Sequence, residues 1–163
     1  MTSPVIARPL GVLMVCLGNI CRSPLAEAAL RAEAERAGLD IIVDSAGTGD
    51  WHVDCPPDPR AVRQAQRHGI DISGYRGRQV RAADFRSFAH IFALDGDNLK
   101  NLRRIRPSDG SATLALLMDM VPGREGSGVT DPYYGDEAGF AQTWDDVTRA
   151  AQAIVAKLRT QPS

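Results

Sequence analysis

Short apolar runs separated by amphipathic stretches recur along the chain, and this alternation is typical of a parallel sheet covered by helices. Three runs predict buried strands, at residues 10–15, 41–43 and 89–94, while Thr113–Leu117 fits either a strand or a helix. Amphipathic or capped stretches predict helices, which we place at about 24–36, 58–68 and 81–85, after residue 95, and at about 136–158. The pattern therefore predicts an α/β fold: a four-stranded parallel sheet with helices on both faces, a Rossmann-like three-layer sandwich with right-handed crossovers.

Length and charge narrow the class of protein. The 163 residues suit a single domain over 1–163, in which residues 1–9 form a flexible tail. A net charge of −1 gives no electrostatic basis for binding nucleic acid or an anionic membrane. The N-terminus lacks a signal-peptide pattern, and no apolar stretch approaches the roughly 20 residues of a membrane span. We therefore expect a cytoplasmic monomer, and three cysteines and three histidines without clustered ligands predict neither a disulfide framework nor a metal site.

One stretch, Val15-Cys-Leu-Gly-Asn-Ile-Cys-Arg-Ser-Pro24, lies between the first predicted strand and the first helix. We expect Ser23 to cap that helix and Pro24 to occupy its first position. The backbone N–H groups of the loop and the helix N-terminus then form a cradle for a tetrahedral oxyanion. Gly18 allows a turn that a Cβ would hinder, and the planar guanidinium of Arg22 matches two phosphate oxygens.

Anything that stabilises an anion in this cradle also stabilises a thiolate on Cys16, which could attack phosphorus. The hydroxyl of Ser23 could donate to that sulfur. The alternative is a buried cysteine at a strand end, followed by an ordinary turn. The full motif between a strand and a helix favours the reactive cysteine.

A phosphate ester also needs an acid, because the leaving oxygen must take a proton. Asp131, in the late loop Val129–Gly135, is our candidate. The alternative is that Asp131-Pro132 is only a turn. Composition allows other acids equally well, namely Asp44, Asp50, Asp95 and Asp97.

Three aromatic residues, Trp51, Tyr133 and Tyr134, fall in predicted loops, where they could form the walls of a cleft for an aryl substrate. They could equally pack in the core or in turns, and Trp144 is assigned to the core. Three polar groups could hold the shape of the cysteine loop: Asn19, Ser45 and His68. For His68 the alternative is a histidine stabilised by a helix C-terminus.

Four strings together closely resemble the low-molecular-weight protein tyrosine phosphatases: residues 15–24, Asp44-Ser-Ala-Gly-Thr-Gly-Asp-Trp51, His68-Gly-Ile70 and Asp131-Pro-Tyr-Tyr-Gly135. The resemblance extends from about Leu10 to Leu158. It implies that Cys16 forms a phosphocysteine, that Asp131 protonates the phenol and then activates water, and that Ser23 assists the departing thiolate. The phosphate would be bound by the loop residues Leu17, Gly18, Asn19, Ile20, Cys21, Arg22 and Ser23.

The resemblance also implies supporting roles for other residues. Asp95 would buttress Arg22 or the pocket, and a network of the other polar residues named above would hold the loop: Asn19, Ser45 and His68. The cleft would be lined by Trp51, Tyr133 and Tyr134, and the tyrosine pair can be phosphorylated in this family. Cys21 either forms a reversible disulfide with Cys16 or simply packs in the loop. No metal or cofactor is expected; the substrate would be a tyrosine-phosphorylated protein, and inorganic phosphate or vanadate would inhibit.

Other functions fit the sequence less well. Arsenate reductases of this fold need a redox cysteine pair near residues 79–89, but this chain has no cysteine after Cys55. A bacterial branch that acts on phosphoarginine carries threonine where this chain has Ile20. A module that only binds phosphopeptides would need neither Cys16 nor Asp131. The sequence of residues 53–57 is unusual for this family, and it leaves open which substrate residues are preferred beside the phosphorylated one.

Overall fold

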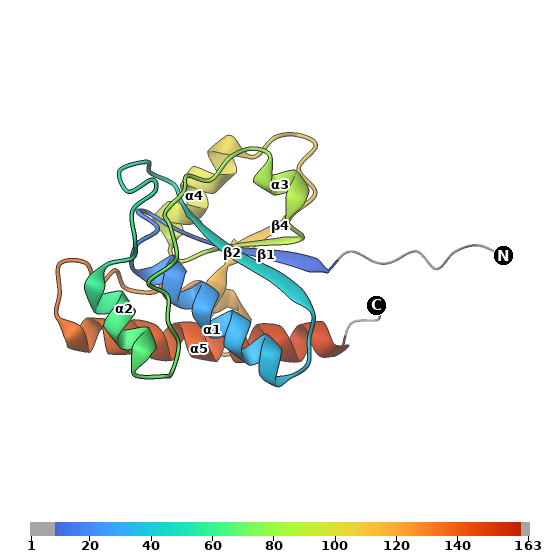
Figure 1. Ribbon diagram of the computed structural model, residues 1–163. Coiled ribbons are helices and arrows are strands. Elements are labelled where there is room, and N and C mark those ends of the chain that lie inside the picture. Colours follow the sequence, from blue (N-terminus) through green and yellow to red (C-terminus); the bar gives the residue numbers. More distant parts are fainter. Residues whose placement is uncertain (1–8, 161–163) are drawn as a thin grey trace.

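The computed structural model describes residues 9–160 (Figure 1). Its four strands form one parallel sheet in the order β2-β1-β3-β4, which confirms the predicted fold class. The strands are β1 (Leu10–Cys16), β2 (Ile41–Gly47), β3 (His90–Ala93) and β4 (Thr113–Leu116). The helices are α1 (Arg22–Arg36), α2 (Pro59–Gln66), α3 (Asp84–Ser87), α4 (Gly96–Ile105) and α5 (Glu137–Thr160), with a 3₁₀ turn, η1, at Leu117–Met120. The tail predicted for residues 1–9 lies outside this range except for the exposed Pro9.

Helices cover both faces of the sheet, and β1 is therefore buried on both sides. Figure 1 shows α1, α2 and α5 below the sheet, and α3 and α4 above it. Val12 and Met14 of β1 pack in the lower cluster, while Leu13 and Val15 pack in the upper one. Side chains alternate along a strand, so a continuous apolar run supplies both layers. No helix within residues 9–160 has the length and apolar character of a membrane-spanning helix.

Two boundaries differ from the sequence prediction. Helix α1 begins at Arg22 rather than Pro24, and no side chain caps it; Cys21, not Ser23, occupies the N-cap position. The Ser23 hydroxyl instead contacts the sulfur of Cys16. The ambiguous run Thr113–Leu117 is a strand up to Leu116 and then turns into η1, so both interpretations hold for part of it.

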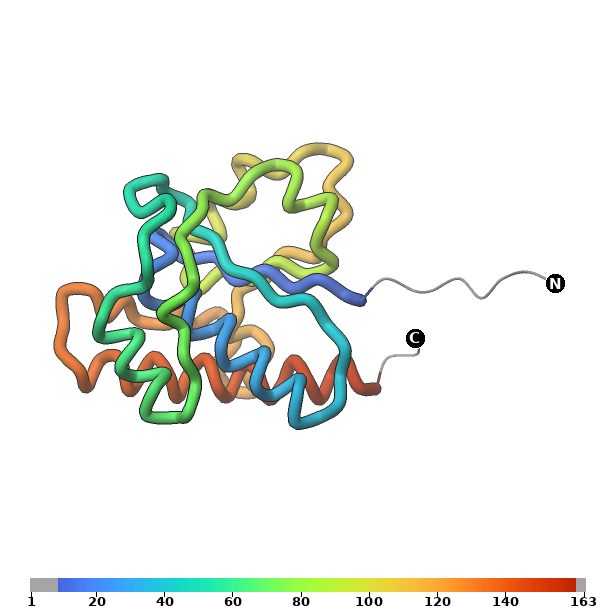
Figure 2. The backbone as a smooth tube through the Cα atoms, viewed as in Figure 1, coloured from blue at the N-terminus to red at the C-terminus, as the bar shows by residue number. Residues whose placement is uncertain are grey.

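The strand order places a crevice at the carboxyl end of β1. From β1 the chain crosses to β2 on one side, whereas β3 lies on the other side and leads on to β4. Loops that leave adjacent parallel strands in opposite directions separate there, which opens a ligand site. Figure 2 shows the loops after β1 and β2, and the loop before α5, gathered at one end of the molecule. This end holds the candidate site.

Candidate active site

A cavity of about 280 Å³ opens at the carboxyl end of β1. It brings together the loop after β1, the loop after β2 and the loop before α5. Its lining residues are Cys16, Leu17, Gly18, Ile20, Cys21, Arg22, Trp51, His52, Asp131, Tyr133 and Tyr134. His52 was not foreseen, although it follows the predicted cleft residue Trp51.

The loop after β1 turns at Asn19 rather than at Gly18. Asn19 has a positive φ of 58°, a conformation that asparagine adopts more readily than most residues, while Gly18 does not. Gly18 allows a close approach, because a Cβ there would lie 3.1 Å from the His52 ring and would displace it slightly. The turn directs the Asn19 backbone N–H toward the Cys16 sulfur, 3.3 Å away.

A chain of buried hydrogen bonds runs outward from the sulfur of Cys16. Asn19 Nδ2 donates to both Ser23 Oγ at 2.8 Å and Ser45 Oγ at 2.9 Å. Ser23 Oγ lies 3.0 Å from Cys16 Sγ and also donates to the Ala46 carbonyl at 3.5 Å. The sulfur thus faces the Asn19 backbone N–H and the Ser23 hydroxyl.

Glu27 and Arg78 complete this network, and sequence reasoning missed both. Ser45 Oγ donates to Glu27 Oε1 at 2.6 Å, and the Arg78 backbone N–H donates to Asn19 Oδ1 at 3.0 Å. Burial raises the pKa of Glu27 to about 7, although Ser45 and Arg31 stabilise its ionised form. The Arg78 side chain is held by carboxylates on two sides, as it contacts Asp44 and Asp84.

Arg22 is the buried cation of the site, with 2% of its surface exposed. Its Nη1 donates to Asp95 Oδ2 at 2.6 Å and to the Val129 carbonyl at 2.9 Å. Burial alone would lower the pKa of Arg22, but Cys16 and Asp95 outweigh burial and raise the pKa above its ordinary value. The other guanidinium nitrogen, Nη2, lies 3.6 Å from Asp131 Oδ2. The predicted contact between Asp95 and Arg22 is therefore present.

The opposite wall of the cavity is the segment Asp131–Gly135, which is largely exposed. Asp131 Oδ1 accepts from the Tyr133 backbone N–H at 3.1 Å, so the Asp-Pro turn and the cavity position occur together. The rings of Tyr133 and Tyr134 meet edge to face at 4.9 Å, and Tyr134 is 96% exposed. Trp51 is 67% exposed. All three predicted aromatic residues line the cavity.

Arg60, on the first turn of α2, fastens this wall. Its guanidinium donates to the Tyr133 carbonyl at 2.8 Å and to the Gly135 carbonyl at 2.9 Å, and it pairs with Asp58. The Asp58 backbone N–H in turn donates to the Ile20 carbonyl at 2.8 Å. The start of α2 therefore joins the exposed wall to the cysteine loop. Sequence reasoning did not identify Arg60.

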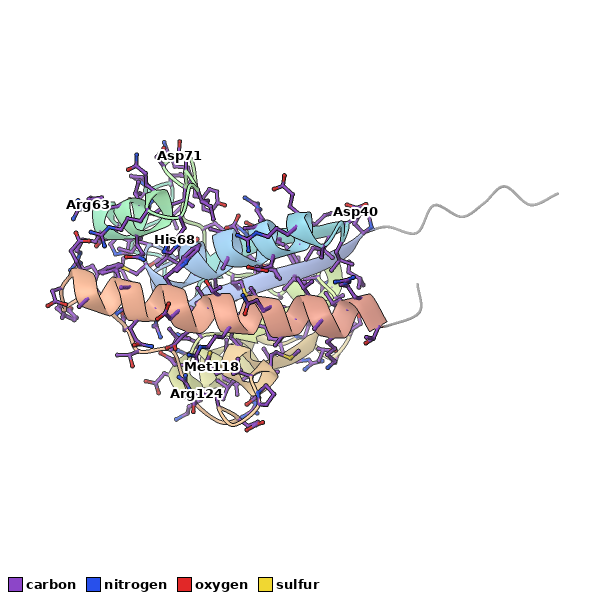
Figure 3. All side chains as sticks on the ribbon, turned by 90° about the horizontal axis from the view of Figure 1, so that it is seen from below. Asp40, Arg63, His68, Asp71, Met118 and Arg124 are labelled. Carbon is purple, nitrogen blue, oxygen red and sulfur yellow. The ribbon has the colours of Figure 1, made fainter. Side chains whose placement is uncertain are left out.

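His68 does not join the loop network, and that prediction was wrong. Its ring stacks on Trp144 of α5 at 4.8 Å and shares a hydrogen bond with Gln64 at 3.3 Å. Figure 3 shows His68 beside α5, at the end of α2. The polar atoms of the Asn19 side chain are already engaged by other groups: Ser23, Ser45 and Arg78. The alternative position, at a helix C-terminus, is the observed one, and Trp144 is buried as predicted.

The structure also places the remaining candidate residues. Of the alternative acids, Asp44, Asp50 and Asp97 do not line the cavity. The three cysteines are free, and burial together with the nearby Asp58 raises the pKa of the Cys21 thiol, which keeps it protonated. Across residues 9–160, no group of three or more His, Cys, Asp or Glu side chains could hold a metal ion.

Fold and cavity define the class: an α/β protein whose first strand delivers a cysteine to a cavity at the carboxyl edge of the sheet. Comparisons with known proteins add the family. The family described as low molecular weight phosphotyrosine protein phosphatase matches residues 11–163. The protein of that name from Schizosaccharomyces pombe is 43% identical over 136 residues, which cover 82% of this chain and 86% of that one.

Solved structures agree. YfkJ from Bacillus subtilis superposes with a TM-score of 0.89 at 34% identity, covering 97% of this chain and 99% of that one. DARP, a Drosophila arginine phosphatase, gives a TM-score of 0.86 at 30% identity, covering 93% of this chain and 99% of that one. The chain therefore belongs to the low molecular weight phosphotyrosine protein phosphatase family, as its motifs predicted, and it is an enzyme, a protein-tyrosine-phosphatase.

Proposed function

We propose that the protein hydrolyses phosphotyrosine in proteins through a phosphocysteine intermediate on Cys16. The observation that carries the proposal is the sulfur itself, which faces the Ser23 hydroxyl and the Asn19 N–H at the floor of the cavity, beside Arg22. In the first step the thiolate attacks phosphorus while the bond from phosphorus to the phenolic oxygen breaks. Loop N–H groups and Arg22 stabilise the charge on the transferring phosphoryl group.

Asp131 supplies the proton for this step. Its carboxyl group lies across the cavity, 3.6 Å from the same guanidinium that would bind the phosphoryl oxygens. Protonated, it donates to the leaving phenolate; ionised afterwards, it takes a proton from the water that attacks the phosphocysteine. The S–P bond then breaks, phosphate leaves, and Ser23 stabilises the returning thiolate. Inorganic phosphate and vanadate, as tetrahedral anions, should compete for the same loop.

The aromatic wall supports an aryl substrate. Trp51 and the two tyrosines offer ring surfaces around a cavity whose floor is polar, which suits a phosphotyrosine side chain. Phosphoarginine is the second candidate, because a structural relative is an arginine phosphatase. Ile20, where the phosphoarginine branch carries threonine, favours phosphotyrosine. A reactive thiolate also requires reducing conditions, which supports the cytoplasm as its compartment.

The test compares turnover on peptides that differ only in the phosphorylated residue: phosphotyrosine, phosphoarginine and phosphoserine. We expect kcat/KM to be highest for phosphotyrosine, and mass spectrometry of the acid-quenched reaction to find phosphate on Cys16. Vanadate should inhibit competitively, and a chelator should leave turnover unchanged. Preference for phosphoarginine would overturn the substrate, and a phosphorylated residue other than Cys16 would overturn the mechanism.

A further inference from the structure

A second groove, of about 330 Å³, lies directly beside the catalytic cavity. The two hollows share Leu17 and Trp51, so these side chains form the partition between them. On the far side of the partition the groove is bounded by the second half of α4, with Arg104 and Ile105 among its lining residues. A chain that places one side chain in the cavity would therefore pass over the partition into this groove.

The groove has a fixed shape. Its floor is the extension of β2, where Gly47 pairs with Gln79 and where Gln79 Nε2 donates to the Thr48 carbonyl at 3.1 Å. At the partition the Trp51 ring packs over the backbone of Gly49, where a Cβ would overlap it. Its rim is apolar and accessible: Leu17 is 42% exposed and Ile105 is 41% exposed.

The charge of the groove points to the chemistry of its occupant. Arg104 is its charged lining residue, no carboxylate lines it, and the polar contact found for Arg104 is Asn101 Oδ1 at 3.5 Å. Within residues 9–160, no carboxylate lies within 4.0 Å of the α4 cations Lys100, Arg103 or Arg104. By contrast, Arg63 on α2 pairs with Glu137. An unpaired cation at the end of an apolar groove fits an acidic side chain.

We propose that this groove binds the segment of the substrate protein next to the phosphotyrosine, and that Arg104 pairs with an acidic side chain in that segment. The inference rests on the proposed phosphotyrosine activity and names the sequence that this activity prefers. Arg104 is a specificity residue here, since it lies outside the catalytic cavity and touches no reacting atom. A small aryl phosphate would fill the cavity without reaching it.

The experiment measures kcat/KM for phosphotyrosine peptides flanked by glutamate or by lysine, on either side of the phosphotyrosine, with p-nitrophenyl phosphate as the small substrate. The wild-type protein should prefer the glutamate peptides. Arg104→Glu should lower kcat/KM for them about threefold to tenfold, raise it for the lysine peptides, and leave p-nitrophenyl phosphate unchanged. The matched control is Arg103→Glu, which makes the same charge change one residue away, outside the groove.

The outcomes separate the two proposals. If the wild-type protein hydrolyses p-nitrophenyl phosphate and phosphotyrosine but ignores the flanking charge, the groove proposal alone fails. If Arg103→Glu and Arg104→Glu had equal effects, the preference would come from the overall positive charge of α4, and the groove proposal would also be overturned. Absence of phosphotyrosine turnover in the wild-type protein would instead refute the proposed function.

Discussion

The two walls of the catalytic cavity are built in opposite ways. On one side, Asn19, Arg22 and Ser23 are buried, and their side-chain polar groups meet partners from β2, α1, the loop before Val80 and the loop after β3. On the other side, Asp131 and Tyr134 are exposed, and Arg60 reaches across from α2 to the neighbouring carbonyls of Tyr133 and Gly135. One wall is part of the core, and the other is a surface segment fastened at one point.

The difference matches two chemical demands. Donors that bind a tetrahedral anion work best when they are held in place before the charge arrives, because no reorganisation is then needed. A proton donor must instead meet leaving groups attached to different proteins, and a surface segment accommodates this. Substitutions in the two walls should therefore have different signatures.

The largest effect is expected from Cys16, in the buried wall. Cys16→Ser should lower kcat by at least about 10⁴-fold, because an alcohol is not ionised at neutral pH, while phosphate or vanadate binding by calorimetry survives. Cys21→Ser is the matched control, since its buried thiol is protonated and serine suits an N-cap position; its turnover should stay within about tenfold of wild type. Retained turnover in Cys16→Ser would remove the nucleophile.

On the exposed wall, Asp131→Asn should lower kcat by about 10²–10⁴-fold for phosphotyrosine, since the phenolate then leaves without a proton. The loss should shrink for aryl phosphates with more acidic phenols, which a leaving-group series measures. Asp97→Asn, an exposed residue away from the cavity, is the control. An equal loss for every leaving group would contradict the acid role.

Loosening the exposed wall should cost less than removing its carboxylate. Arg60→Gln deletes the two hydrogen bonds to the Tyr133 and Gly135 carbonyls, and we expect kcat to fall about tenfold while affinity for vanadate stays within about twofold. Arg63→Gln, on the same helix, breaks an ion pair with the Glu137 side chain but touches no carbonyl of the segment. If both variants lose the same activity, the fastening role of Arg60 is wrong.

The last change concerns the free energy of unfolding rather than turnover, at the buried end of the hydrogen-bond network. Burial raises the pKa of Glu27 from its ordinary value of 4.5 to about 7, so the folded protein keeps a proton there that the unfolded chain loses. Its contribution is therefore complete below pH 4.5 and is lost as the pH rises through 7. Urea unfolding should show that Glu27→Gln gains up to about 3 kcal/mol relative to wild type between pH 4.5 and 8.

The control for this measurement is Glu33→Gln, which removes a carboxylate paired with the exposed Arg36 on the same helix. Its difference from wild type should stay nearly constant over that range. A difference for Glu27→Gln that is flat, or that reverses with pH, would contradict the assigned protonation.

The sequence predicted the layers and the residues around the reacting centre, because each carries a local signal. Apolar runs locate the strands, and the motif from Cys16 to Pro24 locates the loop. The supporting residues carry no such signal. In the sequence, Glu27 does not differ from other acidic residues of helices, and Arg60 does not differ from other surface arginines. Their roles depend on which elements the fold brings together.

The wrong predictions have the same origin. His68 was assigned to the network for its chemistry, but the end of α2 directs it against Trp144. Ser23 was expected to cap α1, but its hydroxyl instead contacts the Cys16 sulfur and accepts from the Asn19 side-chain amide. The left-handed turn was expected at Gly18, and Asn19 adopts it with an amide that binds on three sides.

Asp95 has a consequence that reaches beyond the cavity. One of its oxygens accepts the Asn98 N–H and so begins α4, while the other holds Arg22. Replacing this single carboxylate would remove the N-cap of α4 and one contact of the Arg22 guanidinium in one event. A substitution at this position therefore affects folding and turnover at the same time, and a tolerated substitution must preserve both contacts.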